Sequence, residues 1–292
     1  MSQITIDKVH AGGNDFLVHI DEENEHSLTS QQIRWLTDRH MGVGADGVIR
    51  AVRTAHLSDA KALLNEEPGA EWYFDAYDRN GVRIELCGNA LRVLVHVLRE
   101  KGIIEPERRD TVPIATPAGI RDVLIGVAGV TVDLGRWGLA DDYLLNAPGL
   151  HISRPAQAIV VNDLNIVCAL SDDQKLEALC LEEQPELAPL PDEPATVVYA
   201  TPQDPFITDG VAHINIRVRG NASSQLLSSA NGAASAALAF RHWGGGELPN
   251  SWAVHSPGGR LAVRMFATEE GEHVSVSGPV QSVFSLTVEL PE

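Results

Sequence analysis

Basic residues are scarce in this chain. It has 22 lysine and arginine residues against 40 aspartate and glutamate residues, which gives a formal net charge of −18 at pH 7. Nucleic acids and anionic membrane surfaces bind proteins through clustered cations. The composition therefore argues against both as partners. It does not restrict a small-molecule substrate, because a local pocket can be positive on an acidic protein.

Cysteine is equally rare. The three cysteines, Cys87, Cys168 and Cys180, form no C-x-x-C pair and no metal-ligand spacing with the 11 histidines. An odd number of cysteines without a disulfide framework predicts free thiols in a reducing compartment. We therefore expect no metal site, and we expect Cys168 and Cys180 to be inert.

Long apolar stretches are missing as well. No run approaches the roughly 18 residues that cross a bilayer, and the amino terminus has no apolar segment of signal-peptide length. With 44 % hydrophobic and 21 % charged residues the composition is globular, and 292 residues fit two domains. We expect a soluble, cytoplasmic protein.

The hydrophobic pattern predicts the same order of elements in both halves. Strands over 4–9, 16–20, 48–52 and 71–75 precede a helix over 86–98, and strands over 158–161, 166–170, 197–200 and 213–218 precede a helix over 229–241. Each helix is apolar on most faces, so we expect its own sheet to wrap around it. The predicted fold class is α+β, with two pseudo-repeated domains that each place a mixed or antiparallel sheet around a central helix. We assign residues 1–135 and 136–280 to these domains, and we expect the last strand, about 280–292, to complete the first.

Two helix starts are candidate sites, Cys87-Gly88-Asn89 and Ser229-Ala230-Asn231. The first turn of a helix offers unpaired N–H groups and a positive potential, which bind anions such as a carboxylate. The same field lowers the pKa of a cysteine from about 8.5 toward neutrality. A thiolate there can remove the proton next to a bound carboxylate. The alternative interpretation is a buried structural cysteine beside a tight turn.

Residues 42–47 match the dinucleotide pattern G-x-G-x-x-G. A predicted helix precedes them and a predicted strand follows, which is the reverse of the order that binds a pyrophosphate. We therefore expect no nucleotide cofactor at this loop.

Three segments of the first half carry a family resemblance. Residues 8–16 resemble K-M-H-G-x-G-N-D-F, residues 39–47 resemble R-x-x-G-x-G-A-D-G, and residues 80–92 resemble D-G-x-x-x-x-x-C-G-N-G-x-R. Together they resemble the diaminopimelate epimerase family, and the match extends over nearly the whole chain. The resemblance implies a homodimeric isomerase that needs neither pyridoxal phosphate nor a metal. It also implies an active site between two copies of one domain, where one thiolate removes the α-proton and an opposing thiol returns one. The helix amino termini would stabilise the charge that develops in the transition state.

The same resemblance implies a set of site residues. Cys87 and Ser229 stand at the two catalytic positions. The implied substrate contacts are Asn14, Asp78, Gly88, Asn89, Asn162, Asn221, Ala230 and Asn231.

The second half departs from the family pattern. Gly220 and Asn221 replace a glutamate–arginine pair that grips the far end of the substrate, Gln225 replaces a glutamate, and Ser229 replaces the second cysteine. Loss of an arginine that pairs with a substrate carboxylate costs on the order of 2–5 kcal/mol of recognition. We therefore expect a smaller amino or carboxylic acid as the substrate, rather than diaminopimelate.

Serine at position 229 leaves three functions open, because a hydroxyl is a much weaker acid than a thiol. In the first, Cys87 is the base and Ser229 or a water returns the proton, which gives an isomerase or epimerase. In the second, Cys87 is the sole base of a dehydratase or double-bond isomerase. In the third, the protein binds a small carboxylate without turnover. The first is the prediction, and Asp78 is a further candidate acid.

Overall fold

The computed structural model describes residues 2–105, 110–126, 129–220, 225–245 and 247–291. Contacts divide the chain into two compact units, Met1–Val132 with Gly278–Glu292, and Asp133–Ser277. Within the described residues, helices are all too short or too polar to cross a membrane.

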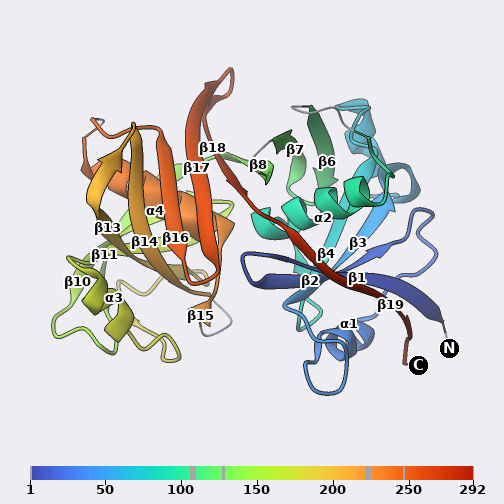
Figure 1. Cartoon of the computed structure of the whole chain (residues 1–292), viewed down its shortest axis with the longest axis horizontal. Coiled ribbons are helices and arrows are strands. Elements are labelled where there is room, and N and C mark those ends of the chain that lie inside the picture. Colours follow the sequence, from blue (N-terminus) through green and yellow to red (C-terminus); the bar gives the residue numbers. More distant parts are fainter. Residues whose placement is uncertain (1, 106–109, 127–128, 221–224, 246, 292) are drawn as a thin grey trace. The chain divides into compact units, whose positions relative to one another are not determined.

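The first unit is a mixed sheet around a central helix, α2 (Gly88–Glu100) (Figure 1). Its strands, in order of pairing, are β19 (Gln281–Glu289), β1 (Gln3–Ala11), β2 (Asn14–Ile20), β3 (Gly47–Arg53), β4 (Trp72–Asp78), β6 (Thr111–Thr116), β7 (Gly119–Gly126) and β8 (Gly129–Arg136). The successive pairs are antiparallel, antiparallel, parallel, antiparallel, parallel, antiparallel and antiparallel. The short β5 (Arg83–Ile84) pairs with β4 and leads into α2. The last strand of the chain thus pairs with the first.

The second unit repeats this plan around α4 (Ala230–Trp243). Its strands, in order of pairing, are β9 (Gly138–Asn146), β10 (Arg154–Val161), β11 (Asp163–Ala169), β13 (Thr196–Thr208), β14 (Val211–Arg219), β16 (Ser251–Ser256), β17 (Gly259–Thr268) and β18 (Gly271–Gly278). The seven successive pairs have the same directions as in the first unit. β15 (Gln225–Leu226) pairs with β14 and precedes α4, as β5 pairs with β4 and precedes α2. β12 (Glu186–Ala188) is an addition at the edge, beside β9.

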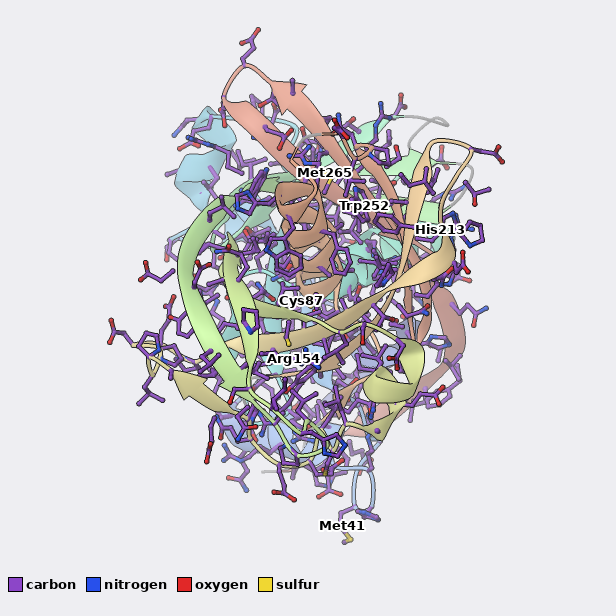
Figure 2. The ribbon with its side chains drawn as sticks, turned by 90° about the vertical axis from the view of Figure 1, so that its left-hand side faces the viewer. Met41, Cys87, Arg154, His213, Trp252 and Met265 are labelled. Atoms are coloured by element: carbon purple, nitrogen blue, oxygen red, sulfur yellow. The ribbon has the colours of Figure 1, made fainter. Side chains whose placement is uncertain are left out.

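Burial of the two central helices explains their composition. Every residue of α2 from Gly88 to Val95 is buried, and α4 is buried continuously from Gly232 to Ala239. A helix that is enclosed on all sides is mostly apolar or small, and the buried polar residues of α2 are Asn89 and Arg92. Figure 2 shows α4 within its strands, with Trp252 of β16 and Met265 of β17 nearby. The predicted fold class is therefore confirmed.

Smaller helices connect the strands. α1 (Ser30–Thr37) lies between β2 and β3, and α3 (Asp173–Ala178) lies between β11 and β13. A capping box fixes the start of α1, because the Thr29 hydroxyl accepts from the Gln32 N–H at 3.2 Å and the Gln32 side chain accepts from the Thr29 N–H at 3.0 Å. Two 3₁₀ helices, η1 (Thr54–His56) and η2 (Lys61–Asn65), occupy the excursion before β4.

Candidate active site

Cys87 occupies the N-cap position of α2. Its backbone is extended, its carbonyl accepts the first helical hydrogen bond from the Leu91 N–H at 2.9 Å, and its side chain makes no capping hydrogen bond. The residue is half-buried. The N–H groups of the first turn have no partner within the helix, and the turn contains no acidic residue. A thiol at this position therefore lies in the positive potential of the helix start.

The three family segments of the first unit meet at this helix start. Arg92 donates from Nη2 to Asn89 Oδ1 at 2.6 Å, and Asn89 Nδ2 lies 3.4 Å from Asn14 Oδ1. Asn14 in turn donates from Nδ2 to Asp46 Oδ2 at 2.8 Å. Positions 14, 46, 89 and 92 thus form one hydrogen-bonded series. The series orients the Asn14 and Asn89 amides, two of the predicted substrate contacts, at the start of the helix that Cys87 caps.

An ion-pair cluster fixes the outer end of this series. Arg39 donates to Asp15 at 2.7 and 3.0 Å and to Asp46 at 2.8 Å, and Lys8 Nζ lies 2.8 Å from Asp15. Burial alone would raise the pKa of Asp15, but the hydrogen bonds from Arg39 and Lys8 outweigh it and lower that pKa to about 2. The hydrogen bond to Asp15 also raises the pKa of Arg39. Asp15 and Arg39 therefore stay charged around neutral pH. The cluster was not identified from the sequence, although each member lies in a family segment.

The glycine-rich loop after α1 has a packing role. A Cβ atom on Gly42 would lie 1.7 Å from the Trp35 carbonyl oxygen, and Gly44 has φ +84° with its Cβ position 2.9 Å from Arg39 Cα. Met41 lies at the tip of this loop and is 77 % exposed (Figure 2). The structure confirms that a helix precedes the loop and that β3 follows it. Its glycines let the backbone fold tightly enough to present Asp46 to Asn14.

Ser229 occupies the N-cap position of α4. Its Oγ accepts from the Gly232 N–H at 3.0 Å, and its carbonyl accepts from the Ala233 N–H at 3.0 Å. Serine is a preferred N-cap residue, so the hydroxyl stabilises the helix whatever else it does. Its hydrogen is not used by the cap and remains able to donate.

The turn between β10 and β11 brings a carboxylate to the start of α4. Asn231 donates from Nδ2 to Asp163 Oδ2 at 3.1 Å. Asp163 is the first residue of β11, as Asn14 is the first residue of β2, so this contact repeats the one between Asn89 and Asn14. The sequence prediction named the preceding residue, Asn162, which is an exposed turn residue with φ +62°. Its role as a substrate contact stays a prediction. Comparing the first residues of the two repeated strands would have indicated Asp163. Asn221, also predicted, lies outside the described residues.

Asp78 ends β4, where its carboxylate stabilises a turn. Its Oδ1 accepts from the N–H groups of Asn80 and Val82 at 2.9 and 2.8 Å, and its Oδ2 accepts from Asn80 Nδ2 at 3.1 Å. α1 holds the same turn, because Arg34 donates to the Asn80 carbonyl at 3.2 Å. These contacts are the structural explanation for an aspartate at this position, and its role as an acid or substrate contact stays a prediction.

Both arginines of β14 donate hydrogen bonds to backbone carbonyls. Arg217 donates to three carbonyls in and after α3 and to Gln225 Oε1 at 2.8 Å. Arg219 is 9 % exposed and donates to the carbonyls of Glu183 and Gly220 at 3.1 and 3.2 Å. Neither guanidinium therefore replaces the arginine that the family pattern places two residues after Arg219.

The other two cysteines differ sharply in environment. Cys168 is fully buried in β11, and burial raises the pKa of its thiol to about 12. Cys180 is exposed. A cavity of about 710 Å³ borders Arg219 and the segment 184–195, and its lining includes no residue of α4 or of the turn at Asn162.

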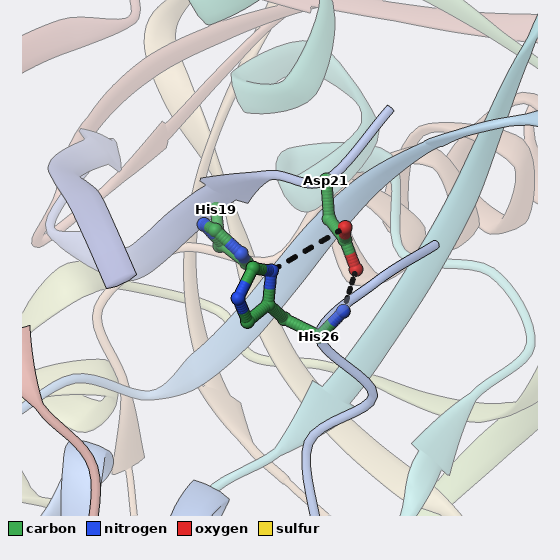
Figure 3. Close-up of side chains that lie close together, drawn as sticks. All are labelled: His19, Asp21 and His26. Atoms are coloured by element: carbon green, nitrogen blue, oxygen red, sulfur yellow. Dashed lines mark hydrogen bonds and ion pairs between the residues drawn. The ribbon is translucent and has the colours of Figure 1, made fainter. Parts of the chain in front are cut away.

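His19, Asp21 and His26 form the one group of possible metal ligands among the described residues (Figure 3). The Asp21 carboxylate already accepts from the N–H groups of Glu25 and His26, and from Arg50 at 2.8 Å. The His19 Nδ1 is 2.9 Å from the Thr5 carbonyl. A guanidinium in contact with the only carboxylate opposes a bound cation. The group therefore holds the loop between β2 and α1 in place.

The fold and the two helix starts define a class of protein. It consists of two units with the same strand succession, and each central helix begins at a side chain that can carry a proton. Comparison with known proteins gives the family. No family model matches the chain. It is 28 % identical over 291 residues to the diaminopimelate epimerase of Streptomyces coelicolor, covering 95 % of this chain and 93 % of that protein. It is 30 % identical over 275 residues to the diaminopimelate epimerase of Mycobacterium bovis, covering 88 % of each. The chain belongs to the diaminopimelate epimerase family and is an isomerase of this fold.

Solved structures share the fold at low sequence identity. A Bacillus anthracis phenazine biosynthesis protein of the PhzF family has a TM-score of 0.69 at 13 % identity, covering 99 % of this chain and all of that one. A hydroxyproline epimerase from Agrobacterium vitis has a TM-score of 0.63 at 15 % identity, covering 98 % and 92 %. A methylitaconate-delta-isomerase has a TM-score of 0.55 at 11 % identity, covering 98 % and 95 %. These likenesses concern the fold alone.

Proposed function

We propose that the protein is a cofactor-independent isomerase that inverts the α-carbon of a small amino or carboxylic acid. Cys87 removes the α-proton, and Ser229, or a water molecule that it holds, returns one. The observation that carries this proposal is the position of Cys87 at the N-cap of a buried helix. Its thiol does not cap that helix, and two oriented amides lie beside it.

The substrate carboxylate is held by N–H groups and amides at the helix starts. In the first unit these are the N–H groups that begin at Gly88 and the side chains of Asn14 and Asn89. In the second unit Ala230 and Asn231 supply the equivalent groups. When the proton leaves, negative charge moves onto the carboxylate oxygens, where these donors stabilise it. Asn162, Asn221 and Asp78 stay as predicted contacts.

Protons balance over one turnover. The Cys87 thiolate takes the α-proton and becomes a thiol, while the opposite face of the carbanion receives a proton from Ser229 or its water. Water then restores the proton to the donor, and Cys87 releases its own proton to solvent. The scheme needs no pyridoxal phosphate and no metal.

The residues of β14 favour a substrate smaller than diaminopimelate. Gly220 stands where the family pattern has glutamate, and both Arg217 and Arg219 are bound to backbone carbonyls. A second carboxylate at the far end of the substrate would lose a charge-assisted contact worth on the order of 2–5 kcal/mol. A substrate with one carboxylate and a short side chain avoids this loss.

The use of the Ser229 hydroxyl as a helix cap favours a second candidate function. Its Oγ accepts from the Gly232 N–H, and a hydroxyl donates protons poorly, so Cys87 can instead act as the sole base. The product would then lose a leaving group or shift a double bond, and an isomerase of methylitaconate has this fold. A third candidate is a protein that binds a small carboxylate without turnover.

Incubation in D₂O separates the three functions. Purified protein is mixed with amino acids, hydroxy acids and diaminopimelate, and products are followed by proton NMR and chiral chromatography. Deuterium at an inverted α-carbon supports the isomerase, and loss of water or a shifted alkene supports the second candidate. Loss of all exchange in Cys87→Ala, with full activity in Cys180→Ser, assigns the base. Failure of every acid to exchange, together with unchanged binding by Cys87→Ala, would overturn both enzymatic proposals.

A further inference from the structure

Arg92 is a buried cation in the second turn of α2. It is 0 % exposed, and its only hydrogen bond among the described residues runs from Nη2 to Asn89 Oδ1 at 2.6 Å. Its Nε and Nη1 are buried and have no hydrogen-bond partner there. Arginine is almost never fully buried without an anion, because an uncompensated charge in a low-dielectric interior is very costly.

The guanidinium of Arg92 points toward the start of its helix. Side chains in an α-helix lean toward the amino terminus, and the hydrogen bond to Asn89, three residues earlier, fixes this direction. The guanidinium therefore lies along the first turn of α2, the turn that Cys87 caps. Burial lowers the pKa of Arg92 to about 10, and the charge of Cys87 opposes that shift. Arg92 thus remains a cation at neutral pH and interacts with Cys87.

The charged groups of the ion-pair cluster beyond Asn14 compensate one another. Lys8 and Arg39 pair with Asp15 and Asp46 in the cluster described above, so two cations balance two anions. Strand β1 also carries His10, whose Nδ1 accepts from the Gly13 N–H at 3.3 Å. None of these groups pairs with Arg92, whose guanidinium hydrogen-bonds to the neutral amide of Asn89.

We propose that Arg92 is the buried counter-ion of the Cys87 thiolate and holds the reactive sulfur in its basic form. This inference rests on the proposed function, because it concerns the base of that reaction. Arg92 is fully buried and Cys87 is half-buried, so their attraction is screened less by water than that of two exposed charges. Arg92 also fixes the Asn89 amide through its hydrogen bond, and it is therefore a positioning residue that does not touch the substrate itself.

The thiol pKa of Cys87 measures this role without any substrate. In a Cys180→Ser background, the rate of alkylation of Cys87 by iodoacetamide is measured from pH 5 to pH 10 by intact mass. Replacement of Arg92 by methionine should raise the midpoint of that profile by about one pH unit or more, which is a tenfold loss of thiolate near neutrality. Arg92→Lys keeps the cation and should recover most of the shift. Arg99→Met, an exposed change on the same helix, is the matched control and should leave the midpoint in place.

Two outcomes would overturn the inference. One is an unchanged midpoint in a folded Arg92→Met protein, checked by circular dichroism. The other, if that protein does not fold, is a midpoint in Arg92→Gln, which also removes the cation, that coincides with the midpoint of Arg99→Met. A different result would contradict the proposed function, namely the absence of α-proton exchange in the unmodified protein. A shifted midpoint without exchange, or exchange without a shifted midpoint, therefore identifies which of the two is wrong.

Discussion

Cys87 and Ser229 cap the two central helices in the same backbone conformation. Their φ and ψ angles are −139° and 113° for Cys87, and −142° and 121° for Ser229. Only Ser229 uses its side chain as a cap, with the Gly232 N–H as donor. The repeated fold therefore places a thiol and a hydroxyl at equivalent helix starts.

Substitution of Ser229 separates its structural and chemical roles. Ser229→Ala should lower the free energy of unfolding by about 1 kcal/mol through loss of the cap, and it should reduce α-proton exchange. Ser229→Cys should lose a similar amount of stability but restore a second thiol, and exchange with inversion should rise above that of the unmodified protein. Urea unfolding and D₂O exchange measure the two effects. Equal exchange in all three proteins would exclude Ser229 as the proton donor.

Substitution of Asp163, which contacts Asn231, tests whether its carboxylate donates the proton in place of Ser229. Asp163→Asn keeps an acceptor for Asn231 and reproduces the amide pair of the first unit. With Ser229 as the donor, we expect exchange rates within about threefold of the original and little change in stability. Asp163→Ala removes the acceptor and should weaken substrate binding, seen as a higher KM. A loss of more than about tenfold in kcat for Asp163→Asn would transfer the proton-donating role to Asp163.

Asp15 should make the protein sensitive to acid. Its pKa is lowered to about 2 in the folded protein, although burial alone would raise it. A carboxylate with a depressed folded pKa contributes stability above its unfolded pKa near 4 and loses it as the pH falls toward 2. After allowance for solvent screening this contribution is about 1–2 kcal/mol. The stability difference between the unmodified protein and Asp15→Asn, from urea unfolding at pH 2 to 6, should shrink across this range. A constant difference would contradict the assignment.

Gly42 should be intolerant of any side chain. The added Cβ in Gly42→Ala would lie 1.7 Å from the Trp35 carbonyl oxygen, so the loop must move away from α1. We expect a loss of about 2 kcal/mol or more in the free energy of unfolding. Gly138→Ala is the matched control, because its added Cβ meets nothing within 4 Å and its effect should stay within about 0.5 kcal/mol. Equal effects of the two changes in thermal unfolding would contradict the packing role.

The three thiols should differ in reactivity. Cys168 is fully buried and its pKa is raised to about 12, so iodoacetamide at pH 8 should leave it unmodified in the folded protein. Cys87 and Cys180 should both be alkylated, as peptide mass spectrometry after digestion will show. Modification of Cys168 at the rate of Cys180 would mean that β11 opens under native conditions.

The sequence alone was sufficient for the local structure and the fold class. Hydrophobic periodicity placed the central helices, and the small polar residues at their starts placed Cys87 and Ser229 at the N-caps. These features depend on residues within a few positions of one another, which is why a single sequence reveals them. The family segments added the prediction that Cys87 and Ser229 are the catalytic residues.

Only the tertiary structure decided which side chains meet at those helix starts. Asn14 contacts Asn89 across 75 residues of chain, and Asn231 contacts Asp163 across 68. Such contacts depend on strand register and on how each helix packs in its sheet, where a shift of one residue reverses the direction of a side chain. For this reason the sequence named Asn162 and did not reveal the contact between Asp163 and Asn231. The burial of Arg92 beside Cys87 also emerged only after the sheet had closed around its helix.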